Sequence, residues 1–317
     1  MYNKKRKRII LVITVSLIAV LTLFALWDYG RYKEDIENYI PAQTDKDIVY
    51  YDGEPYKYNS QIKNILILGI DNDAPISYQN MSGAGGQADC IMLLSMNQTD
   101  KTVKVIQVPR DSMTDIDIYD DNGNYHSTTK GQLALQYAYT NGARAGCWAT
   151  KKTVSEFLYE IPIDGYIAVD IAAISKMNDI LGGIAITMEE DYTAVDPAFE
   201  KGKTIKLTGE QAERFVRYRD TEAVGSSHER MQRQTQFLPA LVKAAEGKIE
   251  QLYKELEKYI ETNLSGSDIE NIMTYSGQVD EYVFIEGEIK QGEEFEEFYP
   301  DEEKLKNMII KIFYKKI

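Results

Sequence analysis

Residues 64–71 read NILILGID, an apolar run of strand length that ends in an acidic residue. Its apolar residues do not alternate with polar ones, which is typical of a strand buried on both faces. Such a strand belongs to a sheet that helices cover on both sides, and the sequence that follows alternates strand-like with helix-like runs. We therefore predict an α/β fold over residues 61–247, a three-layer α/β/α sandwich with a central mixed sheet.

The runs after residue 71 give the other predicted elements of this domain. Short apolar runs predict four more strands, at residues 90–96, 103–108, 165–170 and 184–188. Longer runs predict helices at residues 131–143, 148–160, 171–183, 207–219 and 228–249. The fourth of these helices opens with Thr208 at a plausible N-cap and Gln211 at the capping-box position.

The N-terminal residues predict a membrane anchor. Residues 9–27 contain no charged side chain and follow five basic residues at positions 4–8. A helix of this length spans roughly 29 Å, enough to cross the hydrocarbon core of a bilayer. A cleaved signal peptide is the alternative, but the run is long for one and no small-x-small cleavage site follows it. We expect a single-pass cell-membrane protein with residues 1–8 in the cytoplasm and the remainder outside.

The exported part is acidic as a whole. Residues 28–60 are polar and tyrosine-rich and are expected to form an extracellular stalk, whereas residues 248–317 form an acidic C-terminal extension. The formal net charge is −14, and removing the five basic residues of the cytoplasmic tail leaves −19 outside. Such a surface does not attract nucleic acid through its overall charge, so we expect no nucleic-acid partner.

Arginine, in contrast, is concentrated in one place. The stretch RFVRYRDTEAVGSSHERMQRQ, residues 214–234, holds five of the ten arginines in the chain. A guanidinium binds phosphate through a planar fork and stays charged when it is desolvated. The stretch therefore predicts either a phosphate-binding cluster or a salt-bridge network with the acidic residues around it.

The spacing predicts how these arginines are presented. In a helix, Arg230 and Gln234 share one face, and Arg233 is offset from it. Arg217 and Arg219 match an extended stretch that points both side chains to one side.

Two acids and a further arginine are expected at one edge of the sheet. Asp71 ends a predicted strand and Asp89 precedes the next one, at loop positions where α/β proteins collect ligands. Two carboxylates on an open face suit Mg²⁺. The alternative is that Asp71 caps a turn and Asp89 forms a hydrogen bond within the loop. Arg110 and Asp111 follow the strand at residues 103–108 and are expected in the same region.

Six blocks of the chain follow one another in a characteristic order: NILILGID, ADCIMLLSMNQTDKTVKVIQVPRDSM, KGQLALQYAY, TVSEFLYEIPIDGYIAVDIAAISKMNDILGGIAITM, LTGEQAERFVRYR and ERMQRQ. Over residues 64–243 this order resembles the LytR-CpsA-Psr family. The resemblance implies a single-pass membrane protein with an extracellular α/β/α catalytic domain, found mainly in Gram-positive bacteria. It implies a phosphotransferase that moves a glycopolymer, such as teichoic acid or capsule, from an undecaprenyl-pyrophosphate carrier to peptidoglycan. The acceptor that it implies is the C6 hydroxyl of N-acetylmuramic acid.

The same resemblance implies roles for individual residues. Mg²⁺ is expected on Asp71 and Asp89. The pyrophosphate is expected against Arg110, Lys130, Arg217, Arg219, Arg230 and Gln234. Arg110, Arg217 and Arg219 are also implied in catalysis. Either Asp111 or Asp220 takes the proton of the attacking hydroxyl. This chain departs from the family at GQAD, where Gln87 stands in place of the usual arginine before the second metal carboxylate.

Several alternatives stay open at this point. A polyprenyl-pyrophosphate hydrolase would share the site and differ only in its acceptor, water. A non-catalytic lipid-carrier-binding attenuator is a further reading, although the eight residues before the anchor leave no room for a cytoplasmic effector domain. A channel for the lipid is expected among residues 133–139 and 171–181, unless these are plain core. Cys90 and Cys147 are both exported and form either a disulfide or two buried free thiols.

Overall fold

The computed structural model describes residues 48–317 except for 73–74, 76–80, 221–224, 277–278 and 294. The predicted cytoplasmic tail, the predicted transmembrane helix and most of the predicted stalk lie outside the described residues. No helix within the described part is long and apolar enough to cross a membrane. The chain divides into two compact units, Met1–Lys57 and Tyr58–Ile317. In the first, strand β1 (Ile48–Tyr51) pairs antiparallel with β2 (Glu54–Tyr58).

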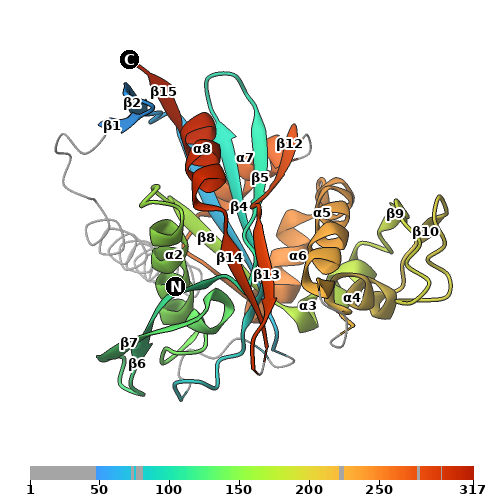
Figure 1. Cartoon of the computed structure of the whole chain (residues 1–317). Coiled ribbons are helices and arrows are strands. Elements are labelled where there is room, and N and C mark those ends of the chain that lie inside the picture. The colour runs from blue at the N-terminus through green and yellow to red at the C-terminus, as the bar shows by residue number, and fades with distance from the viewer. Residues whose placement is uncertain (1–47, 73–74, 76–80, 221–224, 277–278, 294) are drawn as a thin grey trace, which may run out of the picture. The chain divides into compact units, whose positions relative to one another are not determined.

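The second unit is built on a six-stranded mixed sheet with the order β11–β8–β3–β4–β5–β12 (Figure 1). Its strands are β3 (Ile62–Ile70), β4 (Ala88–Asn97), β5 (Val103–Gln107), β8 (Gly165–Asp170), β11 (Ile260–Thr262) and β12 (Glu281–Phe284). Strand β3 runs parallel to β8 and antiparallel to β4, and β5 runs antiparallel to β4. The C-terminal ends of strands β3, β5 and β8 therefore lie at the same end of the sheet as the N-terminal end of β4.

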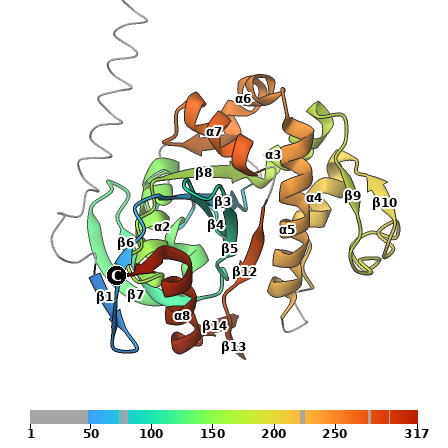
Figure 2. The same cartoon turned by 90° about the horizontal axis from the view of Figure 1, so that it is seen from above.

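Helices cover both faces of this sheet (Figure 2). The helices are α2 (Ala143–Phe157), α3 (Ile171–Ile180), α4 (Gly209–Arg217), α5 (Ser226–Ala245), α6 (Ile249–Leu256), α7 (Gly266–Ser276) and α8 (Glu302–Phe313). Helices α2 and α8 pack on the face that presents Leu66 and Leu68. The opposite face presents Ile65 and packs against α5 and α7. This alternation along β3 explains the unbroken apolar run, because a strand that is covered on both sides needs apolar residues on both of its faces.

Shorter elements surround the sheet. Three hairpins consist of β6 (Met113–Tyr119) with β7 (Tyr125–Gln132), β9 (Ala185–Thr187) with β10 (Thr204–Lys206), and β13 (Gly287–Gln291) with β14 (Glu296–Pro300). The remaining elements are the 3₁₀ helices η2 (Leu133–Gln136) and η3 (Glu257–Tyr259) and strand β15 (Tyr314–Lys316). The strand predicted at residues 184–188 is β9, and it pairs with β10 outside the central sheet.

The helix predicted at residues 131–143 is wrong. Strand β7 continues to Gln132, a single 3₁₀ turn follows, and α2 begins only at Ala143. The buried side chain of Gln136 explains the interruption, because its amide exchanges two hydrogen bonds of 2.8 Å with the backbone of Asp117 in β6. The segment is therefore fixed against the β6–β7 hairpin and not extended as a helix.

The predicted boundary at residue 247 does not divide the fold. Strand β11 from the C-terminal extension pairs with β8, and β12 pairs in parallel with β5, so the extension supplies both edge strands of the central sheet. Helix α8 adds Leu305, Ile309 and Phe313 to the core on the α2 face. The acidic residues that make this part look separate in sequence lie mostly on its exposed surface.

Candidate active site

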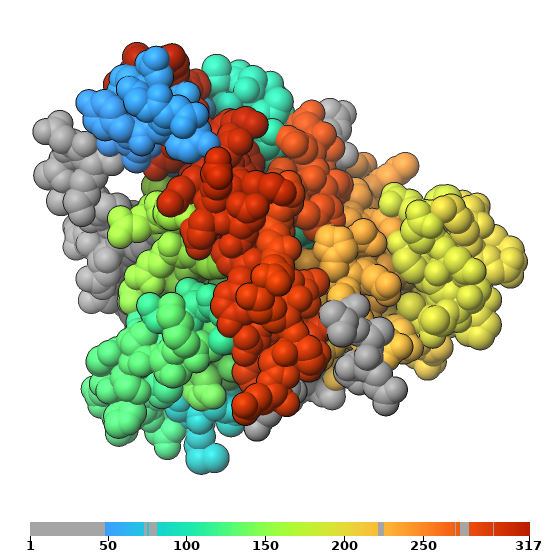
Figure 3. Space-filling view, in the orientation of Figure 1, coloured from blue at the N-terminus to red at the C-terminus, as the bar shows by residue number. Residues whose placement is uncertain are grey.

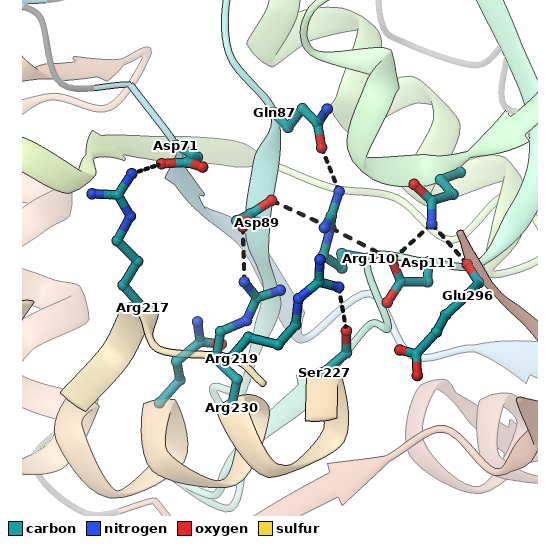
Figure 4. A network of polar contacts seen from close by, with 12 residues as sticks. Asp71, Gln87, Asp89, Arg110, Asp111, Arg217, Arg219, Ser227, Arg230 and Glu296 are labelled. Atoms are coloured by element: carbon teal, nitrogen blue, oxygen red, sulfur yellow. Dashed lines mark hydrogen bonds and ion pairs between the residues drawn. The ribbon is translucent and has the colours of Figure 1, made fainter. Parts of the chain in front are cut away.

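The predicted site residues meet where β3 ends and β4 begins (Figure 4). Ile70 pairs with Ala88 across a β-bulge, and this register brings Asp71 and Asp89 to the same edge of the sheet. The intervening loop returns through Gly86, whose φ of +84° lies in the left-handed region. A Cβ at this position would lie 2.9 Å from the backbone oxygen of Asp71, so the turn requires glycine.

Asp89 joins two arginines from different elements. Nη1 of Arg230, on α5, donates to Oδ2 of Asp89 at 2.8 Å, and Nε of Arg110, from the turn after β5, lies 3.3 Å from Oδ1. Only 4% of the Arg230 side chain and 9% of the Arg110 side chain are exposed. Burial lowers the pKa of Arg230, while the nearby Asp89 carboxylate acts in the opposite direction. A guanidinium nevertheless stays charged, so two buried cations face one carboxylate.

Two polar atoms of α5 residues that line an apolar pocket have no hydrogen-bond partner within the described residues. One is Nε of Arg230 and the other is Oε1 of Gln234, and both are buried. The amide nitrogen of Gln234 donates to the backbone oxygen of Val216 at 3.1 Å, which fixes the side chain. Unsatisfied buried polar groups are costly, and they are typical of sites where a ligand supplies the missing partner.

Asp71 is held by the C-terminal end of α4. Nη2 of Arg217 lies 2.9 Å from Oδ1 of Asp71, and Nη1 lies 3.2 Å from Glu213 one turn earlier. The predicted capping box is present at the other end of α4, where Thr208 and Gln211 bond each other's backbone amides. Arg217 is the last residue of this helix, so the extended stretch expected for Arg217 and Arg219 is wrong for the first of the pair.

Arg219 approaches the same region from the chain that leaves α4. Its Nη1 donates to Oγ of Ser227 at 3.2 Å, in the first turn of α5 (Figure 4). Four arginines, Arg110, Arg217, Arg219 and Arg230, therefore gather around Asp71 and Asp89. Ser227 was not foreseen from the sequence, because a serine at the start of a helix has no distinguishing pattern.

Gln87 and Asp111 flank Arg110. Oε1 of Gln87 accepts a hydrogen bond from Nη2 of Arg110, so the residue that replaces the family's arginine contacts another arginine of the cluster. Asp111 is buried, and its Oδ1 accepts from Nε2 of Gln132 at 2.8 Å. The same Gln132 nitrogen donates to the backbone oxygen of Glu296 at 2.8 Å, which ties Asp111 to strand β14.

Three other residues considered from the sequence lie elsewhere or act differently. Lys130, on the exposed β6–β7 hairpin, pairs with Asp115 at 3.1 Å and does not line the pockets at the arginine cluster. Asp220 is exposed beside Arg219 and lines neither pocket. Arg233 is buried, donating Nε to the backbone oxygen of Phe215 at 2.8 Å and Nη2 to that of Tyr218. It joins α5 to the end of α4.

An apolar pocket opens beside the arginine cluster, between the sheet and helices α3, α4 and α5. Its apolar lining is Ile67, Ile70, Met92, Val169, Ile171, Ile174, Met177, Val216, Phe237, Leu238 and Leu241. Asp71, Asp89, Arg217, Arg230 and Gln234 also line it. A second, open and polar pocket shares Asp71, Asp89, Arg217 and Arg230 with the first and adds Arg219. The charged residues therefore lie where an apolar pocket meets a polar one.

The expectation for an apolar channel was half right. Ile171, Ile174 and Met177 of α3 line the apolar pocket. Leu133 and Tyr137 instead belong to the core on the opposite face of the sheet, with α2. The two runs have similar composition, and only the sheet topology distinguishes their positions.

Both cysteines are free. Cys90 lines the apolar pocket, whereas Cys147 of α2 is buried in the core on the other face of the sheet. Burial raises the pKa of the Cys90 thiol to about 12 and that of Cys147 well above its usual value. Of the two open alternatives, the structure has free thiols, with Cys147 buried and Cys90 partly exposed. Within the described residues, no group of three or more His, Cys, Asp or Glu side chains is placed to hold a metal ion.

Comparison with known proteins gives one consistent family. The model of the LytR_cpsA_psr family matches residues 33–296. The polyisoprenyl-teichoic acid–peptidoglycan teichoic acid transferase TagU of Bacillus licheniformis is 25% identical over 283 residues, which cover 86% of this chain and 83% of the relative. The Lin1025 protein of Listeria innocua superposes with a TM-score of 0.58 at 25% identity over 79% of this chain and 96% of its own. A structure of TagT bound to LI-WTA superposes with a TM-score of 0.61 at 22% identity, over 80% and 90% of the two chains.

Proposed function

This chain belongs to the LytR_cpsA_psr family, and from that premise we propose that it is a membrane-anchored extracellular phosphotransferase. It moves a glycopolymer from a polyprenyl-pyrophosphate carrier onto peptidoglycan. The observation that carries the proposal is the contact between two kinds of surface. Arg217 and Arg230 of the cluster line a pocket whose remaining lining is apolar except for Asp71, Asp89 and Gln234, and Arg219 lines the polar pocket that adjoins it. A lipid-linked pyrophosphate has the same two parts, a charged head and an apolar tail.

The arginine cluster supplies the head-group site. In the free protein Arg217 pairs with Asp71 and Glu213, while Arg110 and Arg230 pair with Asp89 and Arg110 also lies 3.7 Å from Asp111. A pyrophosphate offers oxygen acceptors to each guanidinium fork and to the unpartnered Nε of Arg230. Because these cations are already held in place, binding does not have to order them, and they stabilise the charge that develops during phosphoryl transfer.

The apolar pocket supplies the tail site. Residues from β3, β4, α3 and α5 line it, and they contribute aliphatic, Met and Phe side chains without a charge beyond the rim. Burying the isoprene units there is favourable at about 25 cal/mol per Å² of apolar surface removed from water. The predicted anchor at residues 9–27 would keep the domain beside the bilayer from which such a lipid comes.

Mg²⁺ is part of the proposal. Two carboxylates at one sheet edge, both lining the open pocket, suit an ion that takes one or two protein carboxylates and completes its shell with water and phosphate oxygens. Asp71 and Asp89 would hold it. When bound, it neutralises charge on the phosphate oxygens. Both carboxylates are already paired with arginine, so this ion would bind together with the pyrophosphate and not before it.

The reaction is attack by an acceptor hydroxyl, proposed as the C6 hydroxyl of N-acetylmuramic acid, on the phosphorus next to the polymer. The new P–O bond joins polymer to acceptor, the bond to the distal phosphate breaks, and polyprenyl phosphate leaves with the electron pair. The hydroxyl proton goes to Asp111, which lies beside Arg110 and is oriented by Gln132. We choose Asp111 over Asp220 because Asp111 lies 3.7 Å from Arg110 and lines a pocket beside the arginine cluster, whereas Asp220 is exposed and lines none of these pockets.

The test uses the full chain in detergent with a polyprenyl-pyrophosphate-linked oligosaccharide, Mg²⁺ and a peptidoglycan oligomer. Mass analysis should find the oligomer heavier by the oligosaccharide phosphate, together with free polyprenyl phosphate. Oligosaccharide phosphate with an unmodified oligomer would identify a hydrolase. Donor that is bound but intact would identify a non-catalytic carrier-binding protein. Slower product formation by Arg230→Lys would show that the product depends on this site.

A further inference from the structure

A third pocket lies on the other side of Arg110 and is formed with the C-terminal part of the chain. We call it the acceptor-side pocket, and its principal lining is Asp111, His228, Phe284, Ile289, Glu296 and Phe298. These residues come from the turn after β5, the first turn of α5, the end of β12 and the β13–β14 hairpin. Figure 3 shows the C-terminal residues in red lying between the orange α5 and the green β6–β7 hairpin.

Strand order separates this pocket from the apolar one. The apolar pocket lies over β8, β3 and β4, whereas the acceptor-side pocket lies at the ends of β5 and β12, further along the same sheet. Helix α5 shows the same division. Gln234 and Phe237 line the first pocket, and Ser227 and His228, about two turns earlier, line the other. The arginine cluster lies between the two pockets.

The lining combines an apolar wall with carboxylates. Phe284 and His228 are tilted against each other with ring centroids 5.3 Å apart, and Ile289 pairs with Phe298 across the hairpin. Asp111 and Glu296 supply oxygens that only accept hydrogen bonds when ionised. The pocket has a volume of only about 30 Å³, which does not enclose a pyranose ring. The C–H face of such a ring can instead lie against the apolar wall at the mouth of the pocket, with its hydroxyl donors toward the carboxylates.

The carboxylates are held in place by contacts within the protein. Oε1 of Glu296 accepts from the backbone nitrogen of Gly225, the N-cap of α5, at 2.8 Å. Gln132 fixes Oδ1 of Asp111, and no hydrogen bond from the described residues to its Oδ2 is found. Asp111 therefore has one oxygen tied to the scaffold and the other available at the boundary between the arginine cluster and this pocket (Figure 4).

We propose that the acceptor-side pocket is the subsite that receives the acceptor saccharide, with Phe284 and Ile289 as its apolar wall. This assignment rests on the proposed function. In phosphoryl transfer the attacking and leaving oxygens lie roughly in line through phosphorus. If the leaving polyprenyl phosphate extends into the apolar pocket, the acceptor enters from the opposite side of the arginine cluster, where this pocket lies.

The test measures acceptor binding and transfer separately, with the full chain in detergent. Binding of a soluble peptidoglycan oligomer without donor is followed by saturation-transfer NMR and titration. Phe284→Ala and Ile289→Ala should each weaken oligomer binding by about tenfold, and raise its KM in transfer equally, because each removes apolar contact area. Donor binding should not change. Ile289 is partly exposed on a hairpin, so its variant folds even if Phe284→Ala does not. Tyr299→Ala, on the same hairpin but outside the pocket lining, is the matched control.

The outcomes separate this inference from the proposed function. Oligomer that binds wild type and Tyr299→Ala but not the two pocket variants supports the subsite, whether or not transfer occurs. Equal binding by all four proteins, or no binding by wild type, overturns it. Transfer that proceeds with an unchanged oligomer KM in both variants also overturns the subsite while leaving the phosphotransferase intact. Oligomer binding without any donor turnover instead counts against the proposed function.

Discussion

Arg230 and Asp89 form a nearly buried ion pair, with Nη1 and Oδ2 2.8 Å apart and 4% of the arginine side chain exposed. The pair is incomplete in a specific sense. Nε of Arg230 has no hydrogen-bond partner within the described residues, and Arg110 adds a second cation to the same carboxylate. Asp89 thus lies between two guanidiniums that repel each other, and the other nearby carboxylate, Asp111, is 3.7 Å from Nε of Arg110. A bound dianion relieves that repulsion, which is a physical reason for the site to favour pyrophosphate.

Replacing single arginines by lysine tests whether the two-pronged hydrogen bonding of the guanidinium is needed, because lysine keeps the charge and loses that geometry. Arg217→Lys, Arg219→Lys and Arg230→Lys should each lower the transfer rate about ten- to a hundredfold, since a charge-assisted hydrogen bond contributes roughly 1.5–3 kcal/mol. Arg144→Lys is the control, because its partner Glu261 lies in the α2 region away from the pockets and accepts from lysine too. Initial rates and melting temperatures are measured for all four. Lower melting temperatures with unchanged rates would make the cluster structural.

Asp71→Asn and Asp89→Asn test the proposed ion. Each should lower turnover by roughly a hundredfold at saturating Mg²⁺ and raise the Mg²⁺ concentration for half-maximal rate, because an amide oxygen is a weaker ligand than a carboxylate. Chelation of wild type should abolish turnover, and added Mg²⁺ should restore it. Asp115→Asn, on the exposed β6–β7 hairpin, should behave as wild type. Full turnover in the presence of chelator would reject the ion.

Arg233 gives the opposite prediction from its neighbours. The offset helix position would allow lysine there, but the buried guanidinium bonds the backbone of Phe215 and Tyr218. Arg233→Lys should therefore lower the free energy of unfolding by about 1–3 kcal/mol. Arg214→Lys, whose partially exposed pairs involve Asp196 and Glu210, should change it by less than about 1 kcal/mol. Thermal unfolding decides, and equal stability of the two variants would contradict the structural role.

Asp170 predicts how stability changes with pH. Burial raises the pKa of this carboxyl to about 7, and its Oδ2 has no hydrogen-bond partner within the described residues. The pKa of aspartate in an unfolded chain is about 3.9. Between these two pKa values the folded state binds more protons than the unfolded state, so the free energy of unfolding falls as pH rises. Asp170→Asn should be more stable than wild type at pH 8, and the difference should shrink by pH 5. Denaturant unfolding measures it.

The cysteines give a prediction that requires no activity assay. Because Cys90 and Cys147 lie on opposite faces of the sheet, reductant should leave the intact mass unchanged. Burial raises the pKa of both thiols, so alkylation at pH 8 should be slow in the native protein and should reach two groups after denaturation. A mass that rises by two hydrogens on reduction would show a disulfide instead.

The sequence pattern within a single element was enough to predict features that depend only on that element. The unbroken apolar run of β3 predicted burial on both faces, and the Thr208–Gln211 spacing predicted a capping box that the structure contains. The same reasoning failed at residues 131–143, where Gln136 bonds a strand nineteen residues earlier. A bond to a partner on another element leaves no periodic signal in the segment itself.

The candidate site shows the same limit. Acids at strand ends and a dense arginine stretch indicated Asp71, Asp89 and Arg230, because strand ends and charge are visible in sequence. The family resemblance implied that Lys130 binds the pyrophosphate, but Lys130 lies on the exposed β6–β7 hairpin, where it pairs with Asp115. Glu296 was missed entirely. It reaches the start of α5 from 71 residues further along the chain, and no spacing rule covers that contact.

The pairing of β12 with β5 has a consequence for how the protein matures. During synthesis, which starts at the N-terminus, β5 is complete at Gln107 long before residues 281–284 are added. Until then, the backbone groups of β5 that later bind β12 have no strand to pair with. Glu296, which caps the arginine-bearing helix, arrives later still. An exposed edge strand recruits other strands, so a nascent or clipped chain that ends near residue 247 is prone to aggregate. The last seventy residues thus complete both edges of the central sheet and add Glu296, which binds the N-cap of the helix that carries Arg230.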